Sequence, residues 1–419
     1  MTCPYADPDC RLDVPPETPR CLCGRYVKHC SQCAARNRAF AHFCRGCGAE
    51  LPPSRANWAA YRGGPRRLGA NSSLPTRDAI TGPTALRLRL GDACRALLGY
   101  DGHLIAVSVN GVVEIADPLR AKSLCRFQVQ GPITAEPCIH DGILYLATRG
   151  QLTAYALAGM TLETPRVRPL WHVPLNATPI QALTAVANRL YVTMASADWR
   201  EVHVIEKQAV RLLYGAQKMS WIVADAETSR AMFLSEDGGN VQLHVAGDEL
   251  ATYSVPLHGL AEHPIALLGG TVFAVFGEAH RLYRIDAVTG AVDEPLEDDT
   301  QFFALTCAGD DQWDRDSVRI DSSGVLFSRT GVRDSFAPHE RATKGSPVIV
   351  QGNAVAVGMD DGRVLIYSIS QLPRHDVWRL GDNSGAAITA LASFDSCIAA
   401  GNRDGVVEVR ELLSKGAGQ

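Results

Sequence analysis

The stretch Ile143-Leu-Tyr-Leu-Ala147, followed by Gly150-Gln-Leu-Thr-Ala-Tyr-Ala-Leu157, decides how the longest part of this chain folds. Both runs are rich in residues that favour strands, and a short turn separates them. Glycine in such a turn supplies the positive φ angles that tight hairpins need. Because no helical period of useful length occurs beyond residue 56, the two runs predict a pair of antiparallel strands.

Similar apolar strands recur along the chain at a regular spacing. The first copy starts near residue 103 and the eighth near residue 397, so the average step is about 42 residues, the length of one four-stranded propeller blade. The sequence therefore predicts an all-β fold, a β-propeller with eight blades favoured and seven as the alternative, because the sixth copy is degenerate. The copies are Leu104–Val109, Ile143–Ala147, Arg189–Thr193, Arg230–Leu234, Thr271–Val275, Ser317–Ile320, Ala354–Gly358 and Cys397–Gly401.

The eighth copy is not followed by an outer strand of its own. A candidate lies just before the first copy, where Ala85-Leu-Arg-Leu-Arg-Leu90 has the period-two alternation of a strand. We predict that this segment pairs with the eighth blade. The pairing would close the ring and remove an exposed sheet edge.

Several copies share further features. An Asp-Gly turn leads into a second strand in Asp361-Gly-Arg-Val-Leu-Ile-Tyr367, and the presumed outer strands carry Trp171 and Trp378. These units resemble PQQ-like propeller repeats, and Trp58-Ala-Ala-Tyr-Arg-Gly63 is similar to the lead-in of such propellers. Quinoprotein dehydrogenases of this kind are exported and use a vicinal Cys-Cys disulfide. The sequence shows neither a signal peptide nor adjacent cysteines, so the PQQ cofactor itself is not expected.

Eight of the thirteen cysteines fall within the first 47 residues. Without a secretory signal, clustered cysteines favour metal over disulfides. Cys30-Ser-Gln-Cys33 and Cys44-Arg-Gly-Cys47-Gly48, ten residues apart, can bring four sulfurs to one point, as tetrahedral zinc requires. With Asn37, Phe40 and Phe43, the pattern resembles a short zinc ribbon. Four thiolates leave no open coordination position, so the predicted ion is structural.

The other four cysteines, Cys3, Cys10, Cys21 and Cys23, repeat the central ten-residue gap, and a glycine again follows the last of them. The module is therefore similar to a double zinc ribbon, with two zinc ions expected. The outer gaps differ, however, because six residues and one residue replace the usual two. Interleaved ligation, or a histidine ligand at His29 or His42, remains open for this first site.

Composition is typical of a globular protein, with 46% hydrophobic and 21% charged residues and a net charge of −4. No segment approaches the ~18 consecutive apolar residues that a membrane span requires. We expect a double zinc-ribbon module at 1–50, a linker and propeller lead-in at 51–83, the propeller at 84–413 and a tail at 414–419. The missing signal favours a cytoplasmic location, and the Ala-, Arg- and Gly-rich composition suits a bacterial source.

No nucleophile elbow, Walker A, dinucleotide-binding or HExxH motif occurs, and no small-molecule substrate is evident. The sequence therefore predicts a non-enzymatic scaffold or adaptor, whose propeller docks a protein partner while the zinc ribbon offers a second contact surface. One alternative is nucleic-acid binding through residues 1–80, which carry 12 Lys/Arg against 6 Asp/Glu. A second alternative is an enzyme with its site in the propeller funnel.

Overall fold

The structure is a computed structural model, and it describes most of the repeat region together with part of the cysteine-rich segment. The described residues are 27–38, 44–49, 51, 70–71, 79–100, 102–157, 167–196, 198–261, 264–268, 270–278, 281–293, 302–307, 317–321, 324–327, 332–335, 341–343, 348–351, 354–368, 376–380, 385–394 and 397–414. Cys3, Cys10, Cys21, Cys23 and the Trp58–Gly63 lead-in lie outside these residues, and the predictions that rest on them stay predictions.

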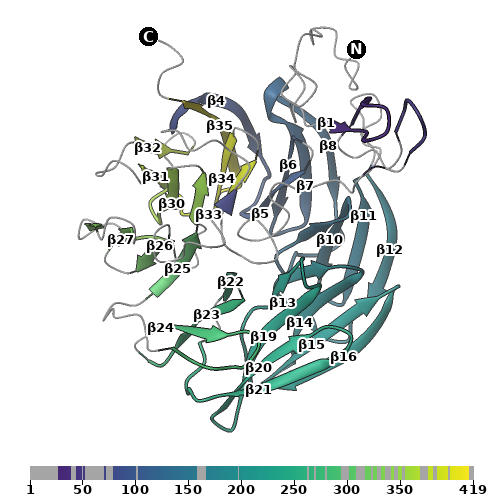
Figure 1. Cartoon of the computed structure of the whole chain (residues 1–419). Coiled ribbons are helices and arrows are strands. Elements are labelled where there is room, and N and C mark those ends of the chain that lie inside the picture. Colours follow the sequence, from purple (N-terminus) through teal and green to yellow (C-terminus); the bar gives the residue numbers. More distant parts are fainter. Residues whose placement is uncertain are drawn as a thin grey trace.

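Strands dominate the described residues, which form one small hairpin and eight larger sheets placed around a ring (Figure 1). Each larger sheet is one propeller blade, so the predicted all-β propeller and its favoured count of eight blades are confirmed. Within the blades, the first strands contact those of neighbouring blades and therefore line the centre of the ring. The described residues include no helix with the length and apolarity that crossing a membrane requires.

The strands of the first four blades follow one another in chain order. Blade 1 has β5 (Cys94–Tyr100), β6 (His103–Ser108), β7 (Val112–Asp117) and β8 (Lys122–Gln128), with a short 3-10 turn at Pro118–Arg120; blade 2 has β9 (Cys138–His140), β10 (Ile143–Thr148), β11 (Gln151–Ala156) and β12 (Arg168–Pro174); blade 3 has β13 (Thr178–Val186), β14 (Arg189–Ser196), β15 (Trp199–Glu206) and β16 (Ala209–Ala216); blade 4 has β17 (Lys218–Met219), β18 (Val223–Asp225), β19 (Arg230–Asp237), β20 (Asn240–Ala246) and β21 (Leu250–Val255).

The last four blades continue the order, and two of them also take in a strand from the segment before blade 1. Blade 5 has β22 (Ala266–Leu268), β23 (Thr271–Phe276) and β24 (Arg281–Asp286); blade 6 has β25 (Phe302–Cys307), β26 (Ser317–Asp321), β27 (Gly324–Phe327) and β28 (Val332–Ser335); blade 7 has β29 (Val348–Gln351), β30 (Ala354–Gly358), β31 (Arg363–Ser368), β32 (Asp376–Arg379) and β3 (Ala70–Asn71); blade 8 has β33 (Ile388–Phe394), β34 (Cys397–Asn402), β35 (Val406–Ser414) and β4 (Ala79–Arg89).

Each of the eight recurring apolar runs forms the second strand of its blade, and the degenerate sixth copy forms β26. The turn before the quoted stretch shows why the hairpins are tight. Asp141 and Gly142 both have positive φ, at 48° and 73°, as a two-residue type I′ turn requires. Trp171 and Trp378 lie on β12 and β32, the outermost strands of their blades, as predicted.

The hydrophobic core lies between neighbouring blades rather than inside any single one. One apolar cluster combines Leu98 and Ile105 of blade 1 with Leu144 of blade 2, and another joins Leu243 of blade 4 to Val272 of blade 5. These side chains are buried almost completely. Because a single sheet buries its apolar faces only against its neighbours, each blade depends on a complete ring.

The ring closes where the last repeat meets the segment before the first. β4 runs antiparallel to β35, and Leu88 pairs with Val407 while Arg89 pairs with Val406. The predicted closure by residues 85–90 is therefore confirmed, and the observed strand is longer because it begins at Ala79. This pairing covers the outer edge of β35, which would otherwise be exposed.

A buried carboxylate holds this closure together. Glu408 of β35 is 1% exposed, and its Oε1 lies 2.5 Å from Nη2 of Arg87 on the closing strand. Its Oε2 accepts a hydrogen bond of 3.0 Å from the indole nitrogen of Trp378 in blade 7. The guanidinium of Arg410 lies over that indole ring, 4.9 Å from its centre. One side chain of blade 8 thus ties blade 7 to the closing strand.

Replacing Arg87 should weaken the ring. In Arg87→Ala the buried Glu408 loses the cation that contacts it, and breaking such a pair costs about 3–5 kcal/mol when both partners are buried. Water reaches the half-exposed Arg87 end, so we expect a smaller loss of about 1–3 kcal/mol in the free energy of unfolding, measured by urea denaturation. Adding Glu408→Gln should recover part of it, and an unchanged Arg87→Ala transition would contradict this role.

Candidate functional site

The strongest candidate site is the cysteine cluster near the N-terminal end of the described chain. A short hairpin of β1 (Val27–His29) and β2 (Arg36–Arg38) carries the first turn of the cluster. In that turn the Cys30 amide donates to the Ala35 carbonyl at 3.0 Å, and the Ala34 amide donates to the Cys30 carbonyl at 2.9 Å. The backbone therefore curls around the first pair of sulfurs.

The second cysteine turn repeats this pattern at the same spacing. The Cys44 amide donates to the Ala49 carbonyl at 2.7 Å, and the Gly48 amide donates to the Cys44 carbonyl at 2.8 Å. Gly48 has a φ of 74°, as expected from its place after the last cysteine, and Ala34 holds the matching position with a φ of 54°. Left-handed backbone is uncommon for alanine, so the sequence pattern gave no sign that Ala34 would adopt it.

The two turns bring the four predicted sulfurs together. Sγ of Cys30 lies 3.6 Å from Sγ of Cys47, Sγ of Cys33 lies 3.5 Å from Sγ of Cys44, and all four lie within 4.8 Å of one another. Tetrahedral zinc with Zn–S bonds of about 2.3 Å separates its sulfurs by roughly 3.8 Å. The cluster is therefore compatible with one zinc ion, and its donor set is that of a structural site.

Neighbouring donors face the sulfurs and fix their positions. The amides of Gln32 and Gly46 point at Sγ of Cys30 and Cys44, at 3.4 and 3.3 Å. The buried Asn37 side chain joins the two turns, because its amide donates to the Ala35 carbonyl at 2.8 Å and its oxygen accepts from the Arg45 amide at 2.8 Å. Such contacts stabilise thiolates and orient metal ligands.

Hydrogen bonds around the sulfurs give the cysteines of the cluster different pKa values. Burial raises the pKa of Cys44, but hydrogen bonds from the amides of Gly46 and Cys47 outweigh it and lower this pKa to about 6. The Ala35 amide lowers the pKa of Cys33, but hydrogen bonds with the thiols of Cys47 and Cys44 raise it to about 12. Metal binding must therefore displace protons from this cluster, which couples zinc affinity to pH.

The described residues bring together four of the eight predicted ligands. Cys30 and Cys44 are buried against Leu51, whereas Cys33 and Cys47 are exposed. His29 precedes Cys30 but does not belong to the group of side chains whose ligand atoms converge. Together with His42, the four earlier cysteines lie outside the described residues, so the second zinc ion stays a prediction.

A second polar cluster lies inside blade 4. His244 is fully buried; its Nε2 lies 2.8 Å from Ser235 Oγ and its Nδ1 lies 3.1 Å from Thr252 Oγ1. The imidazole stacks on Phe233, with a distance of 4.7 Å between ring centres, and lies 4.0 Å from Tyr214. Burial lowers the pKa of His244 to about 4. Both ring nitrogens are engaged by hydroxyl groups of the same blade, those of the buried Ser235 and the exposed Thr252, so this pair of serine and histidine supports the blade.

Comparison with known proteins gives a partial relative and many structural neighbours. No protein-family model matches the chain. A stretch of 111 residues is 37% identical to the outer membrane protein assembly factor BamB of Burkholderia pseudomallei. The match covers 26% of this chain and 28% of the relative, so the chain spans little more than a quarter of that relative's length.

Solved structures resemble the chain over a much larger share of its length. BamB from Moraxella catarrhalis has a TM-score of 0.52 at 18% identity and covers 81% of this chain and 99% of its own. Saccharomyces cerevisiae Sqt1 has a TM-score of 0.55 at 10% identity, covering 80% and 100%. The quinohemoprotein alcohol dehydrogenase ADHIIG from Pseudomonas putida HK5 has 0.58 at 11%, covering 87% and 81%. At these identities the likeness establishes the propeller fold, and PQQ-like propellers are among the neighbours.

The metal content of cysteine variants tests the cluster directly. Cys44→Ser removes one of four converging sulfurs, so we expect it to lower bound zinc by one ion per chain, measured by atomic emission on purified protein. Cys125→Ser is the matched control, because Cys125 lies on β8 and outside the cluster. Equal zinc in wild type and Cys44→Ser would show that these four cysteines hold no zinc.

The buried histidine predicts a pH-dependent stability. An unfolded histidine titrates near 6.5 whereas folded His244 titrates near 4, so the unfolded chain binds more protons between these values. The free energy of unfolding should therefore fall by about 3 kcal/mol as pH drops from 6.5 to 4, at ~1.4 kcal/mol per pKa unit. His244→Gln should remove this dependence of the unfolding free energy on pH, as measured from denaturation curves at several pH values. His172→Gln, on the exposed β12, should retain it.

Proposed function

We propose that this chain is a non-enzymatic protein-interaction scaffold, in which the propeller docks a protein partner and the zinc-binding module supplies a second contact surface. The observation that carries the proposal is the closed ring of eight blades, whose strands support many turns at each end. Such turns form broad surfaces on a rigid frame, and binding residues concentrate in loops held by such frames.

Two further observations support a binding role. The partial relative is named an assembly factor, which describes a protein that works with other proteins. In addition, two buried polar side chains of the described residues, His244 and Glu408, have structural partners. The cysteine cluster likewise offers four thiolates to one ion, and a zinc ion saturated in this way folds its module rather than binding a substrate.

The finer parts of the proposal concern the metal and the compartment. We propose zinc as the metal, held by Cys30, Cys33, Cys44 and Cys47, with a second ion on the four earlier cysteines. We also propose a cytoplasmic location.

The test is affinity purification of the tagged full chain after mild crosslinking, from cells that naturally express it, followed by mass spectrometry. Wild type should enrich the same protein reproducibly over a tag-only control. Cys44→Ser should retain the propeller-bound partner and lose contacts that the zinc module makes. If no protein is enriched, or if nucleic acid is recovered instead and released by raised salt as counterion release requires, the scaffold proposal is wrong.

A further inference from the structure

Two arginines hold equivalent positions in consecutive blades but have different surroundings. Arg189 is the first residue of β14, and Arg230 is the first residue of β19. Both strands are the second strands of their blades, and both arginines lie at the end that faces the turn from the first strand. The repeat therefore offers an internal comparison, in which the same side chain occurs at the same place twice.

Arg189 is neutralised by carboxylates of two blades. Its Nε lies 3.0 Å from Oε1 of Glu206 in blade 3, and its Nη2 lies 2.8 Å from Oδ1 of Asp248 in blade 4. These two hydrogen bonds raise the pKa of Arg189 further above its usual range. Its side chain is 19% exposed. Arg189 therefore fastens blade 3 to blade 4, and its charge is already satisfied.

Arg230 lacks both of these partners because the residues of blades 4 and 5 that match Glu206 and Asp248 carry no carboxylate. Leu190 pairs with Ile205, which sets Glu206 opposite Arg189. In blade 4, Ala231 pairs with Ala246, so the residue opposite Arg230 is Gly247.

The second partner is missing as well. Asp248 directly follows Gly247 in blade 4. In blade 5, Thr271 pairs with Asp286, so the residue that matches Asp248 there is Ala287. Where Arg189 meets two carboxylates, the two matching positions around Arg230 hold a glycine and an alanine. Asp225 of β18 pairs with Arg230 in register, but its carboxylate accepts hydrogen bonds from the Glu227 amide and the Thr228 hydroxyl.

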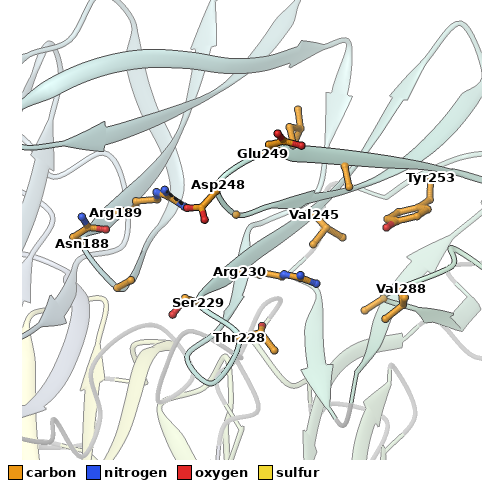
Figure 2. Close-up of a pocket in the computed structure, with 15 residues that line it drawn as sticks. Asn188, Arg189, Thr228, Ser229, Arg230, Val245, Asp248, Glu249, Tyr253 and Val288 are labelled. Atoms are coloured by element: carbon orange, nitrogen blue, oxygen red, sulfur yellow. Dashed lines mark hydrogen bonds and ion pairs between the residues drawn. The ribbon is translucent and has the colours of Figure 1, made fainter.

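The space left by these two changes is a pocket of about 590 Å³ lined by Arg230, Gly247 and Ala287, among others. Figure 2 shows Arg230 directed into the space between Val245 and Val288, with Tyr253 on the far side of that space. Arg230 is exposed, and within the described part of the chain its guanidinium makes no ion pair or hydrogen bond. The pocket thus presents an arginine without an ion-pair partner among the described residues, beside Val245, Val288 and Tyr253. Two carboxylates also line it, Asp248, which pairs with Arg189, and Glu249.

A second pocket lies between blades 2 and 3 and shares Arg189 with the first. Ala187, Asn188 and Arg189 line both spaces, and the second has a volume of about 260 Å³. Its walls include the paired rings of Tyr145 and Trp171, whose centres lie 5.9 Å apart. The two spaces adjoin at these three residues, and we call them together the turn groove because turns of blades 2 to 5 border them.

We propose that the turn groove binds an extended acidic segment of a protein partner, with a carboxylate side chain at Arg230 and an apolar side chain against the paired rings of Tyr145 and Trp171. This inference rests on the proposed scaffold function and names where its partner binds. A small anion would occupy only the Arg230 end, whereas an extended chain advances about 3.3 Å per residue and reaches both spaces. The carboxylate would supply the partner that Glu206 and Asp248 provide to Arg189.

The experiment selects peptides from a random phage-displayed library on the immobilised full chain and measures the best binders by fluorescence anisotropy. Enriched peptides should combine an acidic residue with a large apolar residue at a fixed spacing. Replacing the acidic residue of the peptide, Asp or Glu, by Asn or Gln should weaken binding about ten- to hundredfold, as expected for the loss of a hydrogen-bonded charge pair. Enrichment of basic or wholly apolar peptides, or of none, would overturn the proposal.

Variants of the protein locate the site. Arg230→Glu should weaken the selected peptide more than the peptide amide does, because it adds repulsion between two carboxylates to the loss of the ion pair. Gly247→Glu should also weaken it while Arg230 is intact, because it restores the counter-ion that blade 3 has. Gly247→Ala is its matched control, since an added Cβ meets only Arg230 Cγ at 3.6 Å, and should bind like wild type. Arg149→Glu, on the turn between β10 and β11 at the opposite end of the strands, should also bind like wild type.

The outcomes separate this inference from the scaffold proposal. If the partner found by affinity purification binds Arg230→Glu and Gly247→Glu as tightly as wild type, the turn groove is not its site and the scaffold function stands. If the purification enriches no protein, the scaffold proposal itself fails. Melting curves of each variant must match wild type, and loss of binding in Gly247→Ala as well would point to altered shape and contradict the charge argument.

Discussion

The pairing of β4 with β35 is the interaction on which the rest of the structure depends. Each blade keeps its apolar side chains covered only by the blades beside it, so an open ring would expose two sheet faces and a sheet edge. The closing strand joins residues more than 300 positions apart, and ordering so long a loop is entropically costly. The contacts of Glu408 with Arg87 and Trp378 help to offset that cost at one point.

The cysteine module follows a different physical rule from the ring. Its described part has only a small apolar cluster around Cys30, Cys44 and Leu51, and so small a core supplies little folding free energy. Its order comes instead from four sulfurs set for one ion and from amides aimed at them. The chain therefore combines a domain stabilised by burial with a module whose cysteines are arranged as the ligands of a structural metal ion would be.

Much of this could be predicted because the decisive signals are local. The second strands of the blades are apolar runs beside Asp-Gly or Gly turns, and the two CxxC pairs have the spacing of a metal site, so both were found in the sequence. First strands such as β9 and β22, with three residues each, are too short to give a period. Arg189 and Asp248 are 59 positions apart, and only the closed ring places them together, so the turn groove could not be predicted.

The packing of the ring also limits which positions of a blade can change residue type. A Cβ at Gly401 would lie 2.5 Å from Cys94 Sγ across the junction of blades 8 and 1, whereas one at Gly247 would meet only the flexible stem of Arg230 at 3.6 Å. A substitution at Gly401 therefore disturbs packing between blades, whereas one at Gly247 can alter charge without disturbing the core. Because the core does not require a glycine at position 247, the fold itself does not determine whether Arg230 has the counter-ion that Arg189 has.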